Sequence, residues 1–348
     1  MGHGMRIAVD AMGGDHGPAT IVAGALDGAR RAGVGLTLVG QTDMIQAALA
    51  THDQTGIDIE VLDAPDVIGM DQHPAQAVRR LPNASILVAC RAASSGSAGA
   101  VVSAGNSGAA MAAALLVLGR IPGIDRPAIA SFVPSERGRT LLLDLGAVTD
   151  PRPAHLVQFA RMGSAYAERV GGIASPTVGL LSNGEEPTKG NQLVQETFPL
   201  LAALAGIDFY GNVEGTDITQ GVVDVVVTDG FTGNVALKVA EGVGALVVAA
   251  LRSEVTATLP RKLAALLLRP AFRAVGSKLD YSETGGAALL GVNGAVVIAH
   301  GRSDAKAIAN AVLVAHRAAS QEVVAHIGAA IAAPLGAANP SGPATPTP

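Results

Sequence analysis

The sequence predicts an α/β fold in which helices cover both faces of a largely parallel β-sheet, giving three layers. Short runs rich in β-branched residues, such as RIAVD and VVDVVVTDG, alternate along the chain with longer segments of helical periodicity. This alternation favours parallel pairing, because the chain needs a crossover helix before the next parallel strand can begin. Of the 348 residues, 49% are hydrophobic and 15% are charged, which suffices for one large core or for two lobes around a cleft.

The strands are expected at short apolar runs that end in glycine or polar residues. In chain order these runs are RIAVD, LTLVG, IDIEVL, GAVVSAG, AIASFV, TLLLDLG, TVGLLS, DFYGNV and VVDVVVTDG. The segments between them carry apolar residues at helical spacing. Helices are therefore expected over 18–31, 106–118, 153–170, 190–205 and 233–252, and SILVACRAA is expected to be a buried helix.

Residues 1–333 are expected to form a single α/β catalytic unit with a cleft, because no repeat of fixed period and no long polar linker divides them. Two closely joined lobes are the alternative. The last segment, 334–348, reads PLGAANPSGPATPTP. A segment of this composition has no apolar face to offset the entropy of ordering, so a disordered tail is expected there.

Charge and cysteine content exclude several classes of function. A net charge of −5 and a pI near 5.9 give no positive surface for a nucleic-acid partner. Cys90 is the only cysteine, which excludes an intrachain disulfide and a cysteine-based zinc site and fits a reducing cytoplasm. The start, MGHGMRIAVD, resembles no export signal, and no clean run of ~20 apolar residues is apparent. We therefore expect a compact, soluble cytoplasmic protein.

Four loops rich in glycine and polar residues follow strands, at the positions where open α/β sheets bind ligands. The first loop runs over 10–18 and contains Asp10, Gly13, Gly14 and His16. The two glycines permit tight turns, while the carboxylate and the imidazole supply polar groups. A turn that only caps the following helix is the alternative interpretation.

The second loop, 103–108, reads SAGNSG and precedes an alanine-rich helix. Small residues let backbone N–H groups approach an anion at a helix N-terminus, where the helix dipole also favours negative charge. The Gly-Lys-Ser/Thr of a Walker loop is missing. The loop predicts a phosphate site formed by Ser103, Gly105, Asn106, Ser107 and Gly108.

The third loop, 181–191, reads LSNGEEPTKGN and contains Asn183, Gly184 and Lys189. Lys189 stands just before a predicted helix in a chain that has few lysines. Its ammonium group can hold phosphate or a developing oxyanion. A surface lysine with no such role is the alternative.

The fourth loop, 228–234, reads TDGFTGN and opens the longest predicted helix. Thr232 and Asn234 can donate or accept hydrogen bonds at a cleft, and Gly230 permits a tight turn after Thr228. Asn234 can alternatively act as a helix cap.

Together these loops resemble those of the bacterial PlsX phosphate acyltransferase family. The resemblance spans 5–316 and rests on DAMGGDHGP, SAGNSGA, DLGA, NGEEPTKGN, GNVEG, VVTDGFTGN, LDYSETGG and LLGVNG, in that order. It implies a fold like the isocitrate and isopropylmalate dehydrogenases and the phosphotransacetylases. It also implies a homodimer that transfers a fatty acyl group from acyl carrier protein to inorganic phosphate for phospholipid synthesis. Three residues depart from the family pattern: Ser107 replaces Thr, Val148 replaces Asn and Ala288 replaces Pro.

The resemblance supports a site that works by positioning and needs no covalent acyl-enzyme. We expect the 103–108 loop and Lys189 to hold phosphate, Asn234 to hold the carbonyl oxygen, and His16 to handle a proton. Asp10, Asn183 and their neighbouring glycines belong to the same substrate-binding loops. Preorganised donors and positioning can supply most of the rate of such a reaction. No metal and no redox cofactor are expected.

A basic and apolar segment over 259–278 is predicted to lie in a protruding helical hairpin of about 254–279. Pro270 should break or kink the helix there. One helical face carries Leu263, Leu266 and Leu267. This segment is expected to touch an anionic membrane surface, and packing against a dimer partner is the equal alternative. Its basic residues are suited to steering acyl carrier protein, and a downstream glycerol-3-phosphate acyltransferase is a further expected partner.

Three rival functions remain open at this point. A phosphotransacetylase or phosphobutyryltransferase would use coenzyme A thioesters, so donor preference separates it from the first interpretation. A metal- and NAD-dependent hydroxyacid dehydrogenase would need clustered arginines and aspartates that the sequence does not assemble, and fold analogy is weak support for function. A membrane scaffold without activity would show no turnover.

Overall fold

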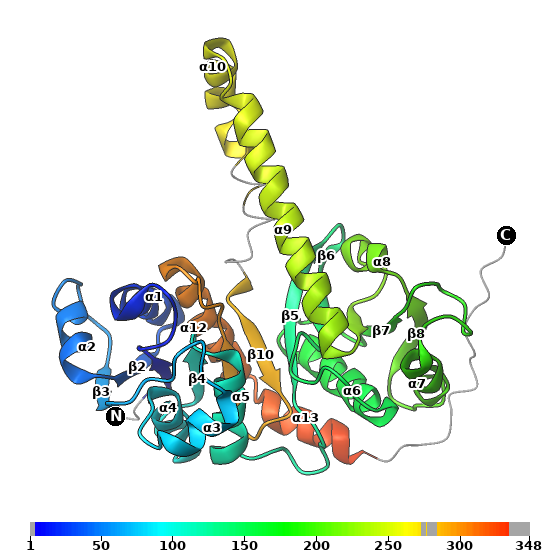
Figure 1. Cartoon of the computed structure of the whole chain (residues 1–348), viewed down its shortest axis with the longest axis horizontal. Coiled ribbons are helices and arrows are strands. Elements are labelled where there is room, and N and C mark those ends of the chain that lie inside the picture. The colour runs from blue at the N-terminus through cyan, green and yellow to red at the C-terminus, as the bar shows by residue number, and fades with distance from the viewer. Residues whose placement is uncertain (1–3, 273–275, 277–283, 334–348) are drawn as a thin grey trace.

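The computed structural model describes residues 4–272, 276 and 284–333 of the chain (Figure 1). The predicted disordered tail, 334–348, lies outside the described residues. The strands are β1 (Arg6–Asp10), β2 (Gly35–Gly40), β3 (Ile59–Asp63), β4 (Ala100–Ser103), β5 (Ala128–Ser135), β6 (Gly138–Leu143), β7 (Thr177–Leu181), β8 (Asp208–Val213), β9 (Val225–Val227), β10 (Ala287–Leu290) and β11 (Ala295–Ile298). The helices are α1 (Gly17–Ala32), α2 (Thr42–Leu49), α3 (Pro74–Arg80), α4 (Ser85–Ser94), α5 (Ser107–Val117), α6 (Pro153–Arg169), α7 (Gln192–Ala202), α8 (Gly215–Gln220), α9 (Gly230–Val255), α10 (Leu259–Leu267), α12 (Ala305–Ser320) and α13 (Val323–Ala332).

The sheet is mixed, and its two halves run in opposite directions. The strand order is β3-β2-β1-β4-β11-β10-β5-β6-β9-β7-β8. The strands from β3 to β11 in this order are parallel to one another, and so are β6, β9, β7 and β8. β10 is antiparallel to both of its neighbours, and β5 is antiparallel to β6. The prediction of a largely parallel sheet is confirmed, with its antiparallel pairs near the centre.

Helices cover both faces of the sheet, which confirms the three layers (Figure 1). Successive side chains of a strand point to opposite faces. In β1, Ile7 and Val9 pack into one core with α1, α6 and α12, whereas Ala8 packs into the other core with α4 and α5. The buried strands therefore read as nearly continuous apolar runs, as expected for a sheet covered on both sides.

The five helices expected between strands are present as α1, α5, α6, α7 and α9, with each end within three residues of its predicted position. SILVACRAA is the buried helix α4. Burial raises the pKa of the Cys90 thiol to about 12, so this cysteine is a packing residue. β10, β11 and α12 were not predicted from the sequence. Glycines on either side of β10 and before β11 divide this stretch into short apolar runs, and LLGVNG was interpreted only as a family motif.

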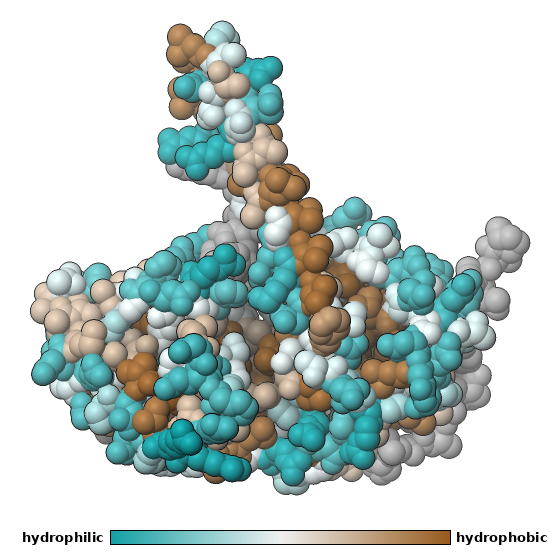
Figure 2. Space-filling view, in the orientation of Figure 1, coloured by the Kyte–Doolittle hydropathy of each residue, from teal (hydrophilic) through white to brown (hydrophobic). Residues whose placement is uncertain are grey.

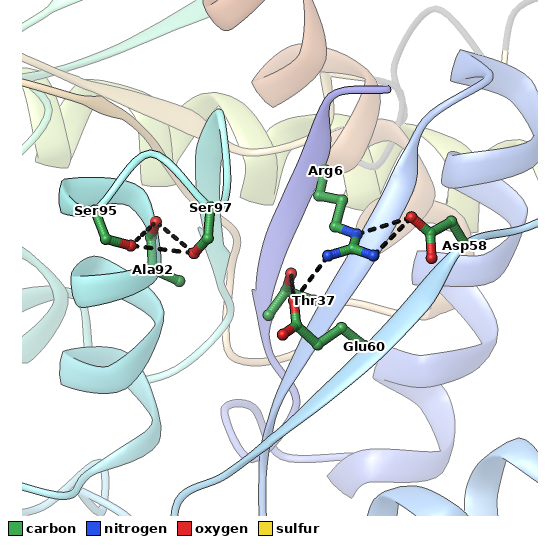
Figure 3. Close-up of polar contacts among 7 residues, drawn as sticks. All are labelled: Arg6, Thr37, Asp58, Glu60, Ala92, Ser95 and Ser97. Carbon is green, nitrogen blue, oxygen red and sulfur yellow. Dashed lines mark hydrogen bonds and ion pairs between the residues drawn. The ribbon is translucent and has the colours of Figure 1, made fainter. Parts of the chain in front are cut away.

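Charged side chains tie together the first three strands at the end of β1 away from Asp10 (Figure 3). The guanidinium of Arg6 lies 2.7 Å from a carboxylate oxygen of Asp58 and 3.1 Å from one of Glu60. The hydroxyl of Thr37 donates to the same Glu60 oxygen at 3.3 Å. These contacts hold β1, β2 and β3 in register at their amino ends.

Helix α9 has 26 residues and extends out of the α/β body, with α10 at its far end (Figure 1). Figure 2 shows its apolar surface, formed by the exposed residues Val235, Val239, Val243, Leu246, Val247 and Leu251. By length and composition, α9 is the one helix among the described residues that could cross a membrane, and one such helix is weak support for a span. Lys238 and Glu241 lie within α9, so this helix is not a clean run of ~20 apolar residues and does not contradict the expectation that none is present.

The chain turns between α9 and α10, within 256–258. The Thr258 hydroxyl accepts a hydrogen bond from the N–H of Arg261, and the Arg261 guanidinium lies 2.9 Å from a carboxylate oxygen of Glu254. Helix α10 ends at Leu267, three residues before Pro270. The predicted hairpin extends past residue 272 to positions outside the described residues, so its full extent stays a prediction.

Candidate active site

The predicted loops lie at the carboxyl ends of two sets of parallel strands. These two ends of the sheet are called the first edge and the second edge. β4 pairs with β1 and β11, so the loops that follow these three strands share one edge. This first edge carries the loops 10–18 and 103–108. β9 pairs with β6 and β7, so the loops that follow them share a second edge. The second edge carries 144–148, 182–191 and 228–234.

A buried carboxylate joins the two loops of the first edge. The hydroxyl of Ser103 donates a 2.7 Å hydrogen bond to Asp10, and the backbone N–H of Met12 donates to the other carboxylate oxygen at 3.2 Å. The N–H of Gly105 in turn donates to the Ser103 hydroxyl at 3.1 Å. Burial raises the pKa of Asp10, and hydrogen bonds from Ser85 and Ser103 oppose that shift.

The glycines of these loops allow the two backbones to touch. A Cβ atom on Gly13 would lie 2.5 Å from the backbone nitrogen of Gly105, and one on Gly108 would lie 2.6 Å from Cγ of Pro74. Gly14 has a φ of 91°, a conformation that favours glycine. The two predicted loops therefore pack directly on each other, and side chains larger than hydrogen would separate them.

A small pocket, partly open to solvent, lies at this contact. Its wall is part polar and part apolar. The polar groups come from Asp10, Ser85, Ser103 and Asn106, and the apolar groups from Val67, Ile68, Ile86 and Ala109. The backbone of Gly13 and Gly105 completes the lining.

The side chain of Asn106 is engaged by the protein itself. Its Oδ1 accepts from the N–H of Ala109 at 3.1 Å and so caps α5. Its Nδ2 donates to the carbonyl oxygens of Gly69, Met70 and Gln72 at 3.2 to 3.3 Å. The amide thus fastens the loop 69–72 over the first edge, while the exposed Ser107 begins α5 beside it.

His16 is exposed and lies directly before α1 without a capping hydrogen bond from its side chain. The N–H of the preceding Asp15 donates to the carbonyl of Gly301 at 2.8 Å. This bond ties the first loop to the loop after β11. The imidazole of His16 is therefore free to face solvent or a ligand at the rim of the first edge.

The second edge is organised by another buried carboxylate. Asp144 accepts hydrogen bonds from the backbone N–H groups of Ile129, Gly146, Ala147 and Val148, at 2.6 to 3.1 Å. Burial raises its pKa, and these four donors oppose the shift. In the sequence, DLGA stands out only as a family motif, because a carboxylate that is satisfied by backbone groups leaves no sequence pattern of its own.

The start of α9 packs on this carboxylate. A Cβ atom on Gly230 would lie 2.7 Å from Oδ2 of Asp144, and one on Gly233 would lie 2.0 Å from the Asp144 carbonyl oxygen. Asp229 caps the helix and binds both the N–H and the hydroxyl of Thr232. The alternative of Asn234 as the cap is therefore wrong, and its side chain lies beside Gly146. The buried Thr228 is hydrogen-bonded to the end of β6. Its N–H donates to the carbonyl of Leu143, and its carbonyl accepts from the N–H of Asp144.

Lys189 is exposed, and its aliphatic chain lies over the buried Gly184, where an added Cβ would come within 2.8 Å of its Cγ. The side chain of Asn183 accepts from the N–H of Gly190 at 2.9 Å and closes the loop. Asn212 of β8 donates to the carbonyl of Glu186 at 2.8 Å and anchors the loop to the sheet. The lysine thus projects from a loop that is fixed at both ends.

Helix α9 connects the two edges. Asn234, Lys238 and Glu241 are four and three residues apart and share one helical face. His300 follows β11 at the first edge. Lys238 and Glu241 are near enough for their charges to act on it, and the charge of Asp15 acts on it as well. The helical face that bears Asn234 is therefore directed toward the first edge.

The structure brings together Asp10, Gly13, Ser103 and Gly105 in one cluster and Gly230, Thr232 and Asn234 in another. Among the described residues, no hydrogen bond or ion pair joins the side chains of His16, Lys189 and Asn234 to one another. No group of three or more His, Cys, Asp or Glu side chains in the described ranges is placed to hold a metal ion. The loop after β11, which packs on the first edge through Ala299 and Gly301, was not predicted as part of the site, because β11 was not predicted.

Comparisons with solved structures support the fold. A phosphotransacetylase from Streptococcus pyogenes aligns with a TM-score of 0.63 at 15% identity, over 91% of this chain and 95% of the other. A 4-hydroxythreonine-4-phosphate dehydrogenase from Klebsiella pneumoniae aligns with a TM-score of 0.54 at 14% identity, over 91% and 98%. The architecture is thus shared with phosphotransacetylases and with a dehydrogenase. The likeness to isocitrate and isopropylmalate dehydrogenases themselves stays a prediction.

Comparisons of sequence give the family. A protein of Geobacter sulfurreducens named phosphate acyltransferase is 52% identical over 312 residues, which cover 90% of each chain. One of the same name from Pelotomaculum thermopropionicum is 48% identical over 327 residues, covering 94% of this chain and 95% of the other. The model of a family described as fatty acid synthesis protein matches residues 5–326. The chain therefore belongs to this family, the PlsX family that its loops resemble.

Proposed function

We propose that this protein transfers a fatty acyl group from the thioester of acyl carrier protein to inorganic phosphate, giving an acyl phosphate for phospholipid synthesis. The observation that carries the proposal is the likeness to phosphate acyltransferases, which runs at about half identity along nearly the whole chain. The loops support it, because they gather small residues, hydroxyls and a lysine at strand ends. These are the groups that hold an anion beside a carbonyl carbon.

The proposed reaction is a direct displacement. An oxygen of the phosphate dianion attacks the thioester carbonyl carbon, the carbon–sulfur bond breaks, and the thiolate takes up the proton that phosphate gives up. The 103–108 loop and Lys189 hold the phosphate, and the Asn234 amide donates to the oxyanion. His16, at the rim, passes the proton between phosphate and thiolate. No covalent acyl-enzyme is required, since positioning and preorganised donors can supply the rate.

The identity of the thioester donor is the part of this proposal that needs the most direct test. The purified protein is incubated with phosphate and either palmitoyl-acyl carrier protein or palmitoyl-coenzyme A, and the acyl phosphate is trapped with hydroxylamine. We expect faster turnover with the carrier-protein donor. Faster turnover with coenzyme A would instead favour a phosphotransacetylase, the class to which one of its structural neighbours belongs.

The proposed setting is the cytoplasmic face of a membrane, where a homodimer binds peripherally. The proposal is supported by the apolar stripe on α9 and by three leucines of α10, Leu263, Leu266 and Leu267, which are 59%, 63% and 84% exposed. Exposed apolar surface of this extent needs a partner. A second copy of the chain would cover the apolar stripe on α9, and a lipid surface would cover the leucines of α10. A downstream glycerol-3-phosphate acyltransferase would receive the product at that membrane surface.

Sedimentation with lipid vesicles tests the membrane contact. We expect the wild-type protein to sediment with vesicles that contain phosphatidylglycerol, and the Leu267→Glu variant to stay in solution. Leu116→Glu is the matched control, because Leu116 is 64% exposed on α5, away from α10. Equal sedimentation of all three proteins would rule out contact through α10.

A further inference from the structure

The backbone on both sides of Lys189 is held by one side chain. The amide nitrogen of Gln195 donates to the carbonyl oxygen of Thr188 at 2.9 Å and to that of Gly190 at 3.1 Å. Gln195 lies in the first turn of α7. Side chains on a helix lean toward its N-terminus, which brings this amide back over the loop that precedes the helix. The residues directly before and after Lys189 are thus tied to α7.

Contacts to β8 and α7 fix the same turn. The N–H of Lys189 donates at 3.0 Å to the carbonyl of Glu186, which also accepts from the buried amide of Asn212 at 2.8 Å. Gly190 has a φ of 92° and is pressed against α7, because a Cβ atom there would lie 2.4 Å from Cγ1 of Val194. The position of the Lys189 backbone is therefore set by β8 and by α7.

The two donors of the Gln195 side chain are both used in this arrangement. A side-chain amide has two N–H groups, and each of the two carbonyls takes one. The glutamine therefore has no N–H left for a ligand, and what it acts on is the backbone that flanks Lys189. Lysine has a flexible four-carbon stem, so its ammonium group is placed accurately only where the backbone that carries it is fixed.

We propose that Gln195 is a positioning residue, which holds the backbone of Lys189 so that the ammonium group meets phosphate. This inference rests on the proposed function, in which Lys189 holds phosphate, and it names a residue outside the four sequence-predicted loops. A displacement of about 1 Å at a site that works by positioning can cost about a hundredfold in rate. Loss of the Gln195 donors should therefore impair the use of phosphate, although this side chain touches no substrate.

Two substitutions at exposed glutamines of α7 test the role of the donors. Gln195→Met keeps the length of the side chain and removes both N–H groups. The kcat/KM for phosphate is expected to fall about tenfold to a hundredfold, while the KM for the acyl carrier protein thioester stays unchanged. Gln192→Met is the matched control and should keep wild-type kinetics, since Gln192 donates within the helix, to Glu196 at 2.7 Å. Wild-type kinetics in Gln195→Met would overturn the inference.

A double-mutant cycle with Lys189→Ala separates positioning from a general effect on the fold. If Gln195 acts through Lys189, Gln195→Met should lower the rate in the wild-type background and leave the residual rate of Lys189→Ala almost unchanged. An equal fold loss in both backgrounds would mean that the glutamine serves the stability of α7, and it would contradict the inference.

Chemical labelling of Lys189 tests the same inference without turnover. Acetylation by N-hydroxysuccinimidyl acetate is followed by mass spectrometry, with the exposed Lys262 as an internal reference. Inorganic phosphate should slow the labelling of Lys189 in the wild type and in Gln192→Met, and a higher concentration should be needed in Gln195→Met. Equal protection in all three proteins, or none in the wild type, would contradict the inference. If phosphate protects Lys189 in the expected pattern but no acyl phosphate forms, the proposed function fails and the role of Gln195 stands.

Discussion

The Ser103 hydroxyl donates a 2.7 Å hydrogen bond to the buried carboxylate of Asp10. This bond joins the carboxyl ends of β1 and β4, two neighbouring strands that lie more than ninety positions apart in the sequence. It places a carboxylate that is 3% exposed in the wall of the cavity at the first edge. The chemistry of this edge therefore depends on how Asp10 ionises.

The stability of the protein is expected to depend on pH through Asp10. Its folded pKa is raised above the usual 3.8, chiefly by burial. Between 3.8 and the folded value, the native state binds more protons than the unfolded state, so the free energy of unfolding falls as pH rises. Relative to Asp10→Asn, which does not titrate, the wild type should lose stability across that window. Urea unfolding of both proteins at a series of pH values measures the difference.

Asp53 provides the control for this prediction. Hydrogen bonds from Thr55 lower its pKa, so the difference between the wild type and Asp53→Asn should change with pH in the opposite direction. A stability difference for Asp10→Asn that grows in favour of the wild type as pH rises would show that the carboxylate is stabilised, not penalised, by its surroundings.

The loop 69–72 is expected to loosen when Asn106 is truncated. Asn106→Ala removes a helix cap and three hydrogen bonds to that loop. Asn191→Ala removes a comparable cap, since Asn191 caps α7 through the N–H of Val194. Each cap contributes about 1 kcal/mol. Hydrogen exchange within 69–72 should accelerate only in Asn106→Ala, and equal rates in the two variants would mean that the amide does not hold the loop.

Close packing at the start of α9 predicts a sharp contrast between two glycines of the same helix. A Cβ atom on Gly233 would lie 2.0 Å from the carbonyl oxygen of Asp144, whereas one on Gly242 would meet nothing within 4 Å. Gly233→Ala should destabilise the protein by about 1–3 kcal/mol and displace Asn234, so acyl transfer should fall. Gly242→Ala should be neutral or stabilising by up to about 1 kcal/mol. Thermal unfolding and turnover check both, and equal behaviour of the two variants would refute the contact with Asp144.

Most of the fold could be predicted from the sequence, because hydrophobic period and loop residues mark elements of ordinary length. The five helices expected between strands and the strands that precede the four loops are recognisable in this way. β10 and β11 are not, since glycines interrupt the stretch that contains them. The place of the loop after β11 at the first edge was missed for the same reason, because it follows only once β11 is known to lie beside β4.

The candidate site could be predicted at the level of loops and not at the level of contacts. Loop residues follow from where strands end, but partners far apart in the chain do not. Asn106 holds carbonyls more than thirty positions earlier, and Asp144 is satisfied by backbone groups on two segments. These arrangements depend on tertiary packing, which a periodic pattern does not encode.

The most direct test of acyl transfer to phosphate is the release of free acyl carrier protein by the purified wild type, with and without phosphate, beside Lys189→Ala. We predict release only when phosphate is present, an equal amount of acyl phosphate, and a rate in Lys189→Ala that is lower by about 10²–10³, as for a lost oxyanion or phosphate donor. Lys262→Ala, an exposed lysine on α10, should keep the phosphate-dependent step. Release of carrier without phosphate would indicate a thioesterase, and no release at all would contradict the account.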